Sequence, residues 1–357
     1  MRILVAAGGT GGHVYPALAV VEELRAQGAL SRVGWIGDPA RLEGRVVRRH
    51  PWIEFYALPS RGVDRRRPWT WPRSAVGAAG NLLRALVLVR QFQPDVVFGT
   101  GGHAAFSPVV AAWLLRVPTV IHEQNARMGL ANRTLARLAD RVLLSFPTTH
   151  GVPRTARALV TGNPVRREVA AVPSQLGDEL LVVGGSLGSR NLVEAMLRAA
   201  PELARTPGLR LRLVTGQAVP VEDATAALAR AGVAAEVVPY ADPFSDALAQ
   251  ARLVVARAGA TTVAEVAAAG RPTVFVPWNG AAGHHQHDNA QAMAAAGGCV
   301  VVPEERARCE LGELVSTLWR DERRLRDMAA AARATARPEA ARRAAEAIIS
   351  LVEGIRI

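Results

Sequence analysis

The start of the chain constrains its fold most, because a buried-type run passes directly into a glycine-rich turn and then into a helical pattern. Residues 3–7 are apolar, residues 8–13 read Gly-Gly-Thr-Gly-Gly-His, and apolar residues recur at helical spacing from Val14. The apolar run predicts a strand and the periodic segment a helix. A glycine turn between them exposes backbone N–H groups at a helix N-terminus, where an anionic or sugar ligand can come close. We therefore predict a ligand site at this turn.

The glycine turn matches neither of two common phosphate-binding motifs. No Lys-Ser/Thr pair follows the glycines, which excludes a P-loop, and His13 stands where a dinucleotide-binding motif has its last glycine. However, Asp38 ends the second predicted strand, roughly where a dinucleotide fold places its ribose-binding acid. On this loop alone, an NAD enzyme and a purely structural turn are both open alternatives.

Length and composition indicate a globular chain with two domains. Half of the 357 residues are hydrophobic, which is enough for two sizeable cores. The only two cysteines, Cys299 and Cys309, match no metal or redox spacing and fit a reducing cytosol. Because the N-terminus opens with a core strand and the longest apolar stretches, such as residues 104–115, are short, we expect neither a leader peptide nor a membrane-spanning helix.

The net charge of +12 comes from arginine alone, since the sequence contains no lysine. One stretch combines clustered arginines with two tryptophans and is followed by apolar residues at helical spacing. Such a basic amphipathic segment is typical of contact with an anionic membrane surface, although a solvated loop before an ordinary core helix is the alternative. Nucleic acid is disfavoured, because aromatic residues are few and no recognition module is present. The residues concerned are Arg61, Arg65, Arg66, Arg67, Trp69, Trp71 and Arg73, then Leu82, Leu83, Leu86, Val87 and Val89.

Strand-like runs alternate with helical patterns along the whole chain, which predicts an α/β protein with parallel sheets. The pattern restarts at residues 180–188, where a second apolar run leads into Gly-Gly-Ser-Leu-Gly and a helix from about Asn191. Two doubly wound domains are therefore expected, with a boundary near residues 161–164, where Gly, Asn and Pro break the pattern. The further predicted strands are residues 33–37, 96–98, 119–122, 142–145, 209–214, 253–256 and 273–276.

Several polar or glycine-rich segments directly follow predicted strands, where open parallel sheets bind their ligands. They are residues 99–103, 122–125 and 257–262, the last followed by Glu265 on a helix. Each alone could be a capped turn. A further polar cluster at residues 284–289 contains three histidines, but its spacing argues against a metal site and favours a helix start that binds a sugar or nucleotide.

Taken together, these segments resemble the MurG family of peptidoglycan glycosyltransferases over essentially the whole chain. The resemblance implies the GT-B fold, two Rossmann-like domains facing across a cleft. It assigns residues 1–161 to an acceptor- and membrane-binding domain and residues 162–337 to a UDP-GlcNAc-binding domain, with a helix over 338–357 that packs back on the first. The motifs are GGTGGH (8–13), GTGGH (99–103), HEQN (122–125), GNPVR (162–166), GGSLGS (184–189), RAGATTVAE (257–265), AAAGRP (267–272) and HQHDNA (285–290).

The resemblance implies an inverting transfer of GlcNAc from UDP-GlcNAc to lipid I, the undecaprenyl-diphospho-muramoylpentapeptide, giving lipid II in peptidoglycan synthesis. It implies a peripheral protein at the cytoplasmic face of the cell membrane, with cell-wall synthesis and division proteins as partners and no cofactor. His103 and His285 depart from the family pattern. The implied contacts are Thr10, Gly11, Gly12 and Asn125 with GlcNAc, Arg166 and Ser186 with the diphosphate end, Glu265 with the ribose, Gln286 with sugar or phosphate, Ala241 with uracil, and Trp69, Trp71, Leu82 and Leu83 with the membrane.

Inversion requires a base that takes the proton of the acceptor hydroxyl while its oxygen attacks the anomeric carbon. We name His13 as this base, because a histidine titrates near neutrality, and Glu123 as the alternative. Binding of the acceptor diphosphate or helix capping is the competing role for His13. Backbone N–H groups can stabilise the leaving diphosphate, so no metal is required in principle. Another UDP-sugar transferase, a UDP-GlcNAc 2-epimerase and a non-catalytic UDP-sugar-binding scaffold are the competing functions.

Overall fold

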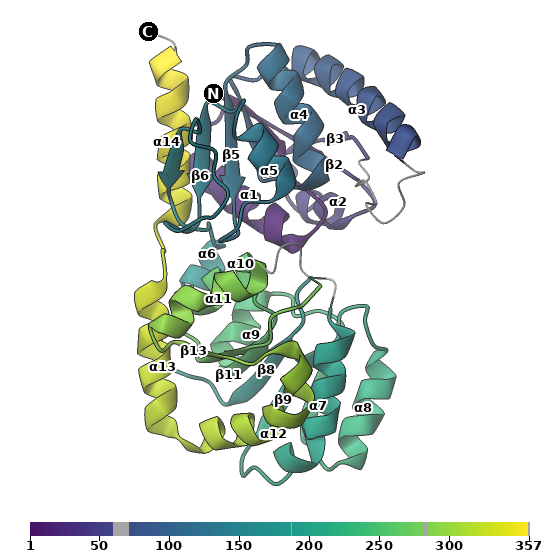
Figure 1. Cartoon of the computed structure of the whole chain (residues 1–357), viewed down its shortest axis with the longest axis vertical. Helices are drawn as coiled ribbons and strands as arrows, with labels where there is room; N and C mark the ends of the chain where they lie inside the picture. Colours follow the sequence, from purple (N-terminus) through teal and green to yellow (C-terminus); the bar gives the residue numbers. More distant parts are fainter. Residues whose placement is uncertain (60–70, 187, 281–284, 356–357) are drawn as a thin grey trace. The chain divides into compact units, whose positions relative to one another are not determined.

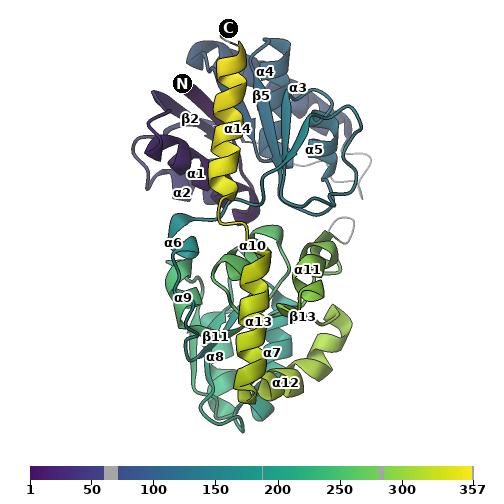
Figure 2. The same ribbon diagram turned by 90° about the vertical axis from the view of Figure 1, so that its left-hand side faces the viewer.

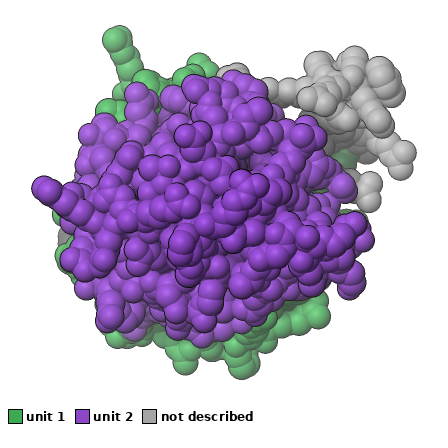
Figure 3. Space-filling model, turned by 90° about the horizontal axis from the view of Figure 1, so that it is seen from below, with its two compact units in different colours: residues 1–164, 339–357 green, residues 165–338 purple. Residues whose placement is uncertain are grey.

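The computed structural model describes residues 1–59, 71–186, 188–280 and 285–355, and the side chains of 71–76 and 355 lie outside this description. The chain divides into two compact units, coloured separately in Figure 3. Unit 1 comprises residues 1–164 and 339–357, and unit 2 comprises residues 165–338. The chain passes between the units twice, once after Pro164 and once after Pro338.

Unit 1 contains a seven-stranded parallel sheet with the strand order β3-β2-β1-β4-β5-β6-β7. Its central strands are buried on both faces, and alternate residues belong to two different cores. Ile3 and Val5 face one core and Leu4 faces the other, because successive side chains of a strand point to opposite faces. The strands are β1 (Arg2–Ala6), β2 (Arg32–Gly37), β3 (Glu54–Ala57), β4 (Val96–Gly99), β5 (Thr119–Glu123), β6 (Arg141–Leu144) and β7 (Ala158–Val160).

Helices cover both faces of this sheet (Figure 1). One core packs α1, α2 and the C-terminal α14 against the sheet, and the other packs α3, α4 and α5. α14 stays on unit 1 because Ile348 and Val352 are buried there and because Arg141 donates hydrogen bonds to the Ala347 carbonyl (2.9 Å) and the Ser350 hydroxyl (2.8 Å) (Figure 2). The helices are α1 (Gly11–Ala26), α2 (Leu42–Val47), α3 (Trp71–Phe92), α4 (Gly102–Leu114), α5 (Leu130–Leu135) and α14 (Ala340–Ile355).

Unit 2 repeats the plan with a six-stranded parallel sheet in the order β10-β9-β8-β11-β12-β13. Leu180 and Val182 face a core with α7, α8 and α12, whereas Leu181 and Val183 face a core with α9, α10 and α11. The strands are β8 (Glu179–Val183), β9 (Arg210–Val214), β10 (Ala235–Val238), β11 (Ala251–Ala256), β12 (Thr273–Phe275) and β13 (Cys299–Val301). The helices are α6 (Arg167–Ala170), α7 (Arg190–Leu203), α8 (Val221–Arg230), α9 (Phe244–Gln250), α10 (Ala260–Ala268), α11 (His285–Ala295), α12 (Glu304–Arg320) and α13 (Glu322–Thr335).

The predicted fold class, two doubly wound parallel-sheet domains, is confirmed. Each of the nine predicted strands is present within a few residues of its expected bounds. Four strands were not predicted, namely β3, β7, β10 and β13, and these are the four edge strands of the two sheets. Among the described helices, none combines the length and the apolar character needed to cross a membrane.

Candidate active site

The candidate residues of unit 1 lie on the loops that follow β1, β4 and β5. These three strands are neighbours in a parallel sheet, so their carboxyl ends meet at the same sheet edge. The loop after β1 leads through Thr10, the N-cap residue, into α1, which begins at Gly11 and carries Gly12 and His13 in its first turn. The backbone of His13 is tied to the second loop, because the Thr100 hydroxyl donates to the His13 carbonyl oxygen (3.0 Å). The glycine-rich loops after β1 and β4 are therefore held together by a hydrogen bond.

His13 belongs to a chain of hydrogen bonds that reaches the interior of unit 1. Its Nδ1 lies 3.1 Å from Oε1 of Gln124. Nε2 of Gln124 lies 3.0 Å from Nδ1 of His122 and donates to the His122 carbonyl (3.2 Å), and Nε2 of His122 lies 3.1 Å from the Gly162 carbonyl. His122 and Gln124 belong to the HEQN segment, but their hydrogen-bonded connection to His13 was not predicted from the sequence.

Glu123, the alternative base, is buried at the end of β5 and has both oxygens engaged. Oε1 accepts from the backbone N–H and the side-chain amide of Asn125, each at 3.0 Å. Oε2 accepts from the Gly129 N–H and the Asn132 amide, also at 3.0 Å. Glu123 therefore orders the loop that presents Asn125, and this role makes it a weaker candidate base than His13.

A buried carboxylate that the sequence analysis missed, Glu43 of α2, joins the loops after β1 and β2. It accepts hydrogen bonds from the Gly9 N–H and from the Asp38 N–H, both at 3.0 Å. The Asp38 side chain instead caps its own turn at the Ala40 N–H (3.0 Å) and pairs with Arg41 at 3.5 Å. Asp38 thus has a local structural role, contrary to its role in the NAD alternative.

Gly102 lies next to the imidazole ring of His13. Its φ of +70° lies in the left-handed region, and a Cβ at this position would lie 3.4 Å from both Cδ2 and Nε2 of His13. The next residue, His103, is exposed at the start of α4. Partial burial of its imidazole ring, together with the nearby positive charge of Arg41, lowers the pKa of His103. The glycine therefore leaves room at the Nε2 side of His13.

In unit 2, the sequence analysis expected Arg166 at the diphosphate and Glu265 at the ribose, but the structure pairs the two residues with each other. Nη2 and Nε of Arg166 donate to Oε1 of Glu265 at 2.8 Å and 3.1 Å. Both side chains are largely buried, with 12% and 6% exposure. Burial raises the pKa of Glu265, and the charge of Arg166 opposes this shift. Arg166 thus orients Glu265, and its expected contact with the diphosphate stays a prediction.

A second buried ion pair in unit 2, between Arg257 and Glu304, was also missed by sequence reasoning. Arg257 follows β11 and donates to the Ser189 hydroxyl (2.9 Å), to the Val276 carbonyl (3.0 Å) and to Glu304. Burial by itself would raise the pKa of Glu304. Hydrogen bonds from neighbouring residues and from Arg257 outweigh this effect, so the pKa of Glu304 is lowered. This one arginine joins the loops after β8, β11 and β12 at the carboxyl edge of the sheet.

The remaining expected donor contacts lie at the same edge of unit 2. Ser186 is exposed in the glycine turn after β8, and Ala241 is half-buried in the loop after β10. Gln286, in the first turn of α11, accepts a hydrogen bond from the Trp278 N–H (2.9 Å) and so supports the loop after β12. His285 begins α11. These positions follow from the strand order.

The four residues expected to contact the membrane differ in how far they are described and exposed in the structure. Trp69 lies outside the described residues, and Trp71 begins α3 with a side chain that is not described. Leu83 is 65% exposed, whereas Leu82 is partly buried against the core of unit 1. Leu82 is therefore in part a packing residue, and the membrane contact of these four residues stays a prediction.

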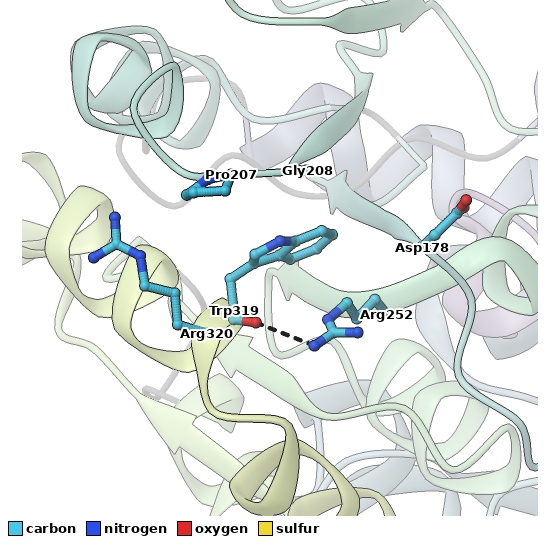
Figure 4. A pocket seen from close by; sticks show the side chains of 6 residues that line it. All are labelled: Asp178, Pro207, Gly208, Arg252, Trp319 and Arg320. Carbon is cyan, nitrogen blue, oxygen red and sulfur yellow. Dashed lines mark hydrogen bonds between the residues drawn. The ribbon is translucent and has the colours of Figure 1, made fainter.

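A cavity of about 410 Å³ opens at the other edge of the unit 2 sheet (Figure 4). Its lining residues come from the amino ends of β8, β9 and β11 and from the last turn of α12, whereas open parallel sheets bind ligands at the carboxyl ends. Within the described parts of the chain, no three His, Cys, Asp or Glu side chains are grouped closely enough to hold a metal ion. The cavity is lined by Asp178, Pro207, Gly208, Arg252, Trp319 and Arg320.

Two Rossmann-like domains, each with loops for a polar ligand at the carboxyl ends of its strands, define the GT-B class of glycosyltransferases. Residues 3–144 match the family model of the glycosyltransferase family 28 N-terminal domain, and residues 179–345 match that of its C-terminal domain. The chain therefore belongs to glycosyltransferase family 28 and, within it, to the MurG family, as the following relatives show.

Relatives of this family match the chain over nearly its whole length. A protein of Nitratidesulfovibrio vulgaris is 39% identical, covering 99% of this chain and 98% of its own. A protein of Halorhodospira halophila is 42% identical, covering 96% of each chain. Both are named UDP-N-acetylglucosamine–N-acetylmuramyl-(pentapeptide) pyrophosphoryl-undecaprenol N-acetylglucosamine transferase.

Solved structures agree with this family membership. The crystal structure of Acinetobacter baumannii MurG is 31% identical, with a TM-score of 0.76 over 98% of this chain and 99% of that one. A UDP-GlcNAc 2-epimerase from Neisseria meningitidis is only 15% identical, with a TM-score of 0.69 over 98% of this chain and 100% of that one. The likeness to the epimerase shows a shared fold alone.

Proposed function

We propose that this protein transfers GlcNAc from UDP-GlcNAc to the muramoyl sugar of lipid I and so forms lipid II, with inversion at the anomeric carbon. The observation that carries the proposal is the placement of His13 at the glycine-rich edge of unit 1, held through Nδ1 by a buried side chain. A neutral imidazole held in this way is suited to accept a proton from a hydroxyl group. Membership of the MurG family supports the choice of donor and acceptor.

Unit 2 provides the donor site in this proposal. Glu265, oriented by Arg166, accepts hydrogen bonds from the ribose hydroxyls, while the loop containing Ala241 meets the uracil. The backbone N–H groups that begin α7 and α10 face the diphosphate, near Ser186. Their partial positive charge stabilises the phosphate charge that grows as UDP leaves, so the protein itself supplies the electrostatic stabilisation.

Unit 1 provides the base and the acceptor site. Thr10, Gly11 and Gly12 bring the backbone close to the transferred sugar, and Asn125 presents its amide from the loop that Glu123 orders. The acceptor hydroxyl gives its proton to His13 while its oxygen attacks the anomeric carbon in a single displacement. In this proposal His103, in the first turn of α4, contacts the acceptor.

The surface formed by α3 and α4 is the proposed contact with an anionic membrane. Large apolar side chains are exposed on both helices, which pack against each other: Leu83 and Val87 on α3, and Trp113 and Leu114 on α4. Neither helix contains Asp or Glu, while α3 carries three arginines. Apolar insertion and arginine attraction to anionic headgroups act together on such a surface. We accordingly place the protein at the cytoplasmic face of the cell membrane, near other cell-wall synthesis and division proteins.

Product analysis tests the function directly. The protein is incubated with radiolabelled UDP-GlcNAc and a lipid I analogue that carries a short prenyl chain. We expect a labelled disaccharide-linked lipid whose formation needs both substrates. Conversion of UDP-GlcNAc alone to its 2-epimer would indicate the epimerase instead. Tight UDP binding without any product from either substrate would indicate a binding scaffold.

A further inference from the structure

Two buried side chains stand behind His13 without touching either proposed substrate site directly. His122, on β5, is fully buried, and Gln124, just after β5, is 2% exposed. Buried polar groups are almost always hydrogen-bonded, and the pattern of donors and acceptors then determines where each proton lies. The hydrogens in the series of hydrogen bonds from Gly162 to His13 can therefore be assigned in turn.

The Gly162 carbonyl fixes the proton of His122. It lies 3.1 Å from Nε2 of His122, and a carbonyl oxygen can only accept a hydrogen bond. Nε2 therefore carries a hydrogen. Burial lowers the pKa of His122 to about 4, so near neutral pH the ring holds this one proton and its Nδ1 is an acceptor.

His122 in turn fixes the orientation of the Gln124 amide. Two acceptors, Nδ1 and the carbonyl oxygen of His122, lie 3.0 Å and 3.2 Å from Nε2 of Gln124. The two hydrogens of the amide nitrogen satisfy both acceptors. The opposite orientation would bring Oε1 against two acceptors and leave buried polar groups without a hydrogen-bond donor, which is unfavourable. Oε1 of Gln124 therefore faces His13.

The remaining contact decides the tautomer of His13. Oε1 of Gln124 lies 3.1 Å from Nδ1 of His13 and can only accept, so Nδ1 carries the hydrogen. Nε2 then holds the lone pair, on the side of the ring where Gly102 leaves room.

We propose that His122 and Gln124 are positioning residues that hold His13 as the Nδ1–H tautomer, with Nε2 aimed at the acceptor hydroxyl. The role of the hydroxyl rests on the proposed function, whereas the tautomer does not. In the transfer step the hydroxyl proton moves to Nε2, the oxygen forms a bond to the anomeric carbon, and the bond to the phosphate oxygen breaks. UDP leaves with that electron pair, and His13 becomes an imidazolium that still donates from Nδ1 to Gln124.

The first experiment reads the tautomer without any substrate. Nitrogen-15 spectra of the histidine rings distinguish a protonated from an unprotonated ring nitrogen, and the signals of His13 are assigned by their loss in His13→Asn. In the wild-type protein, above neutral pH, we expect the proton on Nδ1. In Gln124→Met, which keeps the chain length but not the amide, we expect a shift toward the Nε2–H form. Ser145→Ala is the matched control. It removes a buried hydrogen bond to the Glu123 carbonyl (3.0 Å) but none of the hydrogen bonds that connect Gly162, His122, Gln124 and His13.

The second experiment measures transfer with the same variants. Gln124→Met should lower kcat about 10- to 100-fold and change the donor KM less than about twofold, because the base is still present but no longer oriented. Ser145→Ala should match the wild type. Gln124→Glu provides a second variant that retains an acceptor for Nδ1, and its carboxylate should move the rising limb of the pH–rate profile to higher pH, because it stabilises the imidazolium.

The outcomes separate the two proposals. A wild-type His13 protonated on Nε2, or an unchanged tautomer in Gln124→Met, would overturn the positioning role. A changed tautomer with an unchanged kcat would overturn its link to catalysis. The expected tautomers in a protein that transfers no GlcNAc would overturn the proposed function and leave the positioning chain intact.

Discussion

Unit 1 and unit 2 carry their candidate residues at equivalent sheet edges, but they stabilise them with different polar chemistry. In unit 1, His13 is held by the neutral amide of Gln124, and the buried Glu123 accepts only from backbone N–H and amide groups in its four described contacts. In unit 2, the corresponding edge is organised by buried ion pairs between arginine and glutamate, such as Arg166 with Glu265. The same fold thus supports two different electrostatic environments.

This difference matches what each unit has to do in the proposed reaction. A general base must exchange a proton near neutral pH, and a buried full charge beside it would displace its titration. A nucleotide site has to keep a carboxylate charged and in place for the ribose, and a buried arginine does so. The following predictions test this contrast between a base held by a neutral amide in unit 1 and a carboxylate held by an arginine in unit 2, from the largest effect to the smallest.

Removal of the proposed base should have the largest effect. His13→Ala should lower kcat about 10²- to 10⁴-fold with little change in UDP-GlcNAc affinity, because a base acts in the transition state and not in the ground state. The pH–rate profile checks the assignment, since the rising limb of the wild type should be lost. A normal kcat with a raised acceptor KM would instead make His13 an acceptor-binding residue.

Unit 1 should lose stability in acid through the buried His122. Its folded-state pKa of about 4 lies below the ordinary value of 6.5, so the unfolded chain binds the proton first. Stability is fully present above about pH 6.5 and is lost as the pH falls toward 4, by up to about 3 kcal/mol. Urea unfolding across this pH range measures the free energy of unfolding. We expect this free energy to depend less on pH in His122→Asn than in the wild type.

Exchange of an exposed histidine is the control for this titration. His150→Asn replaces an exposed histidine and leaves the contacts of His122 with Gly162 and Gln124 in place. An equal slope for the wild type and His122→Asn would show that His122 does not stay neutral in the folded protein.

The charged edge of unit 2 should respond in ligand affinity. Glu265→Ala should weaken UDP binding by about 1–3 kcal/mol in calorimetry, because two ribose hydroxyls lose a buried acceptor. Glu265→Gln keeps the size of the side chain, and its affinity for UDP should lie between those of the wild type and Glu265→Ala. Glu168→Ala is the matched control, since Glu168 is half exposed and 3.9 Å from Arg166. An unchanged affinity for UDP in Glu265→Ala would show that Glu265 does not bind the ribose.

The sequence predicted the central strands of both sheets but none of the four edge strands, and burial explains the difference. Central strands such as β1 are covered on both faces and read as continuous apolar runs. The edge strand β7, in contrast, exposes most of its residues, and none of the four residues of β10 is fully buried. A strand that pairs on one side only needs no continuous apolar run, so its sequence resembles a loop.

The site shows the same limit on a smaller scale. The positions of the loops were predictable, because glycine and polar residues directly follow apolar runs at Gly8 and Gly99. The contacts among them were not, because they join residues far apart in the sequence, such as His13 with Gln124 or Arg257 with Glu304. The role of Arg166 could not be read from its motif, since the partner that holds it, Glu265, lies on a different helix.

The smallest effect is expected at the membrane surface, which lies outside both polar edges. Leu83→Ser with Val87→Ser should weaken binding to anionic vesicles by about 1–2 kcal/mol, because both side chains are exposed on α3 and insertion of such apolar groups drives association. Turnover of a short-chain acceptor should be unchanged, and added salt should weaken wild-type binding. Leu159→Ser is the control, since Leu159 is 45% exposed on the edge strand β7. If the double variant sediments with vesicles as the wild type does while Leu159→Ser does not, the membrane contact lies beside β7 and not on α3.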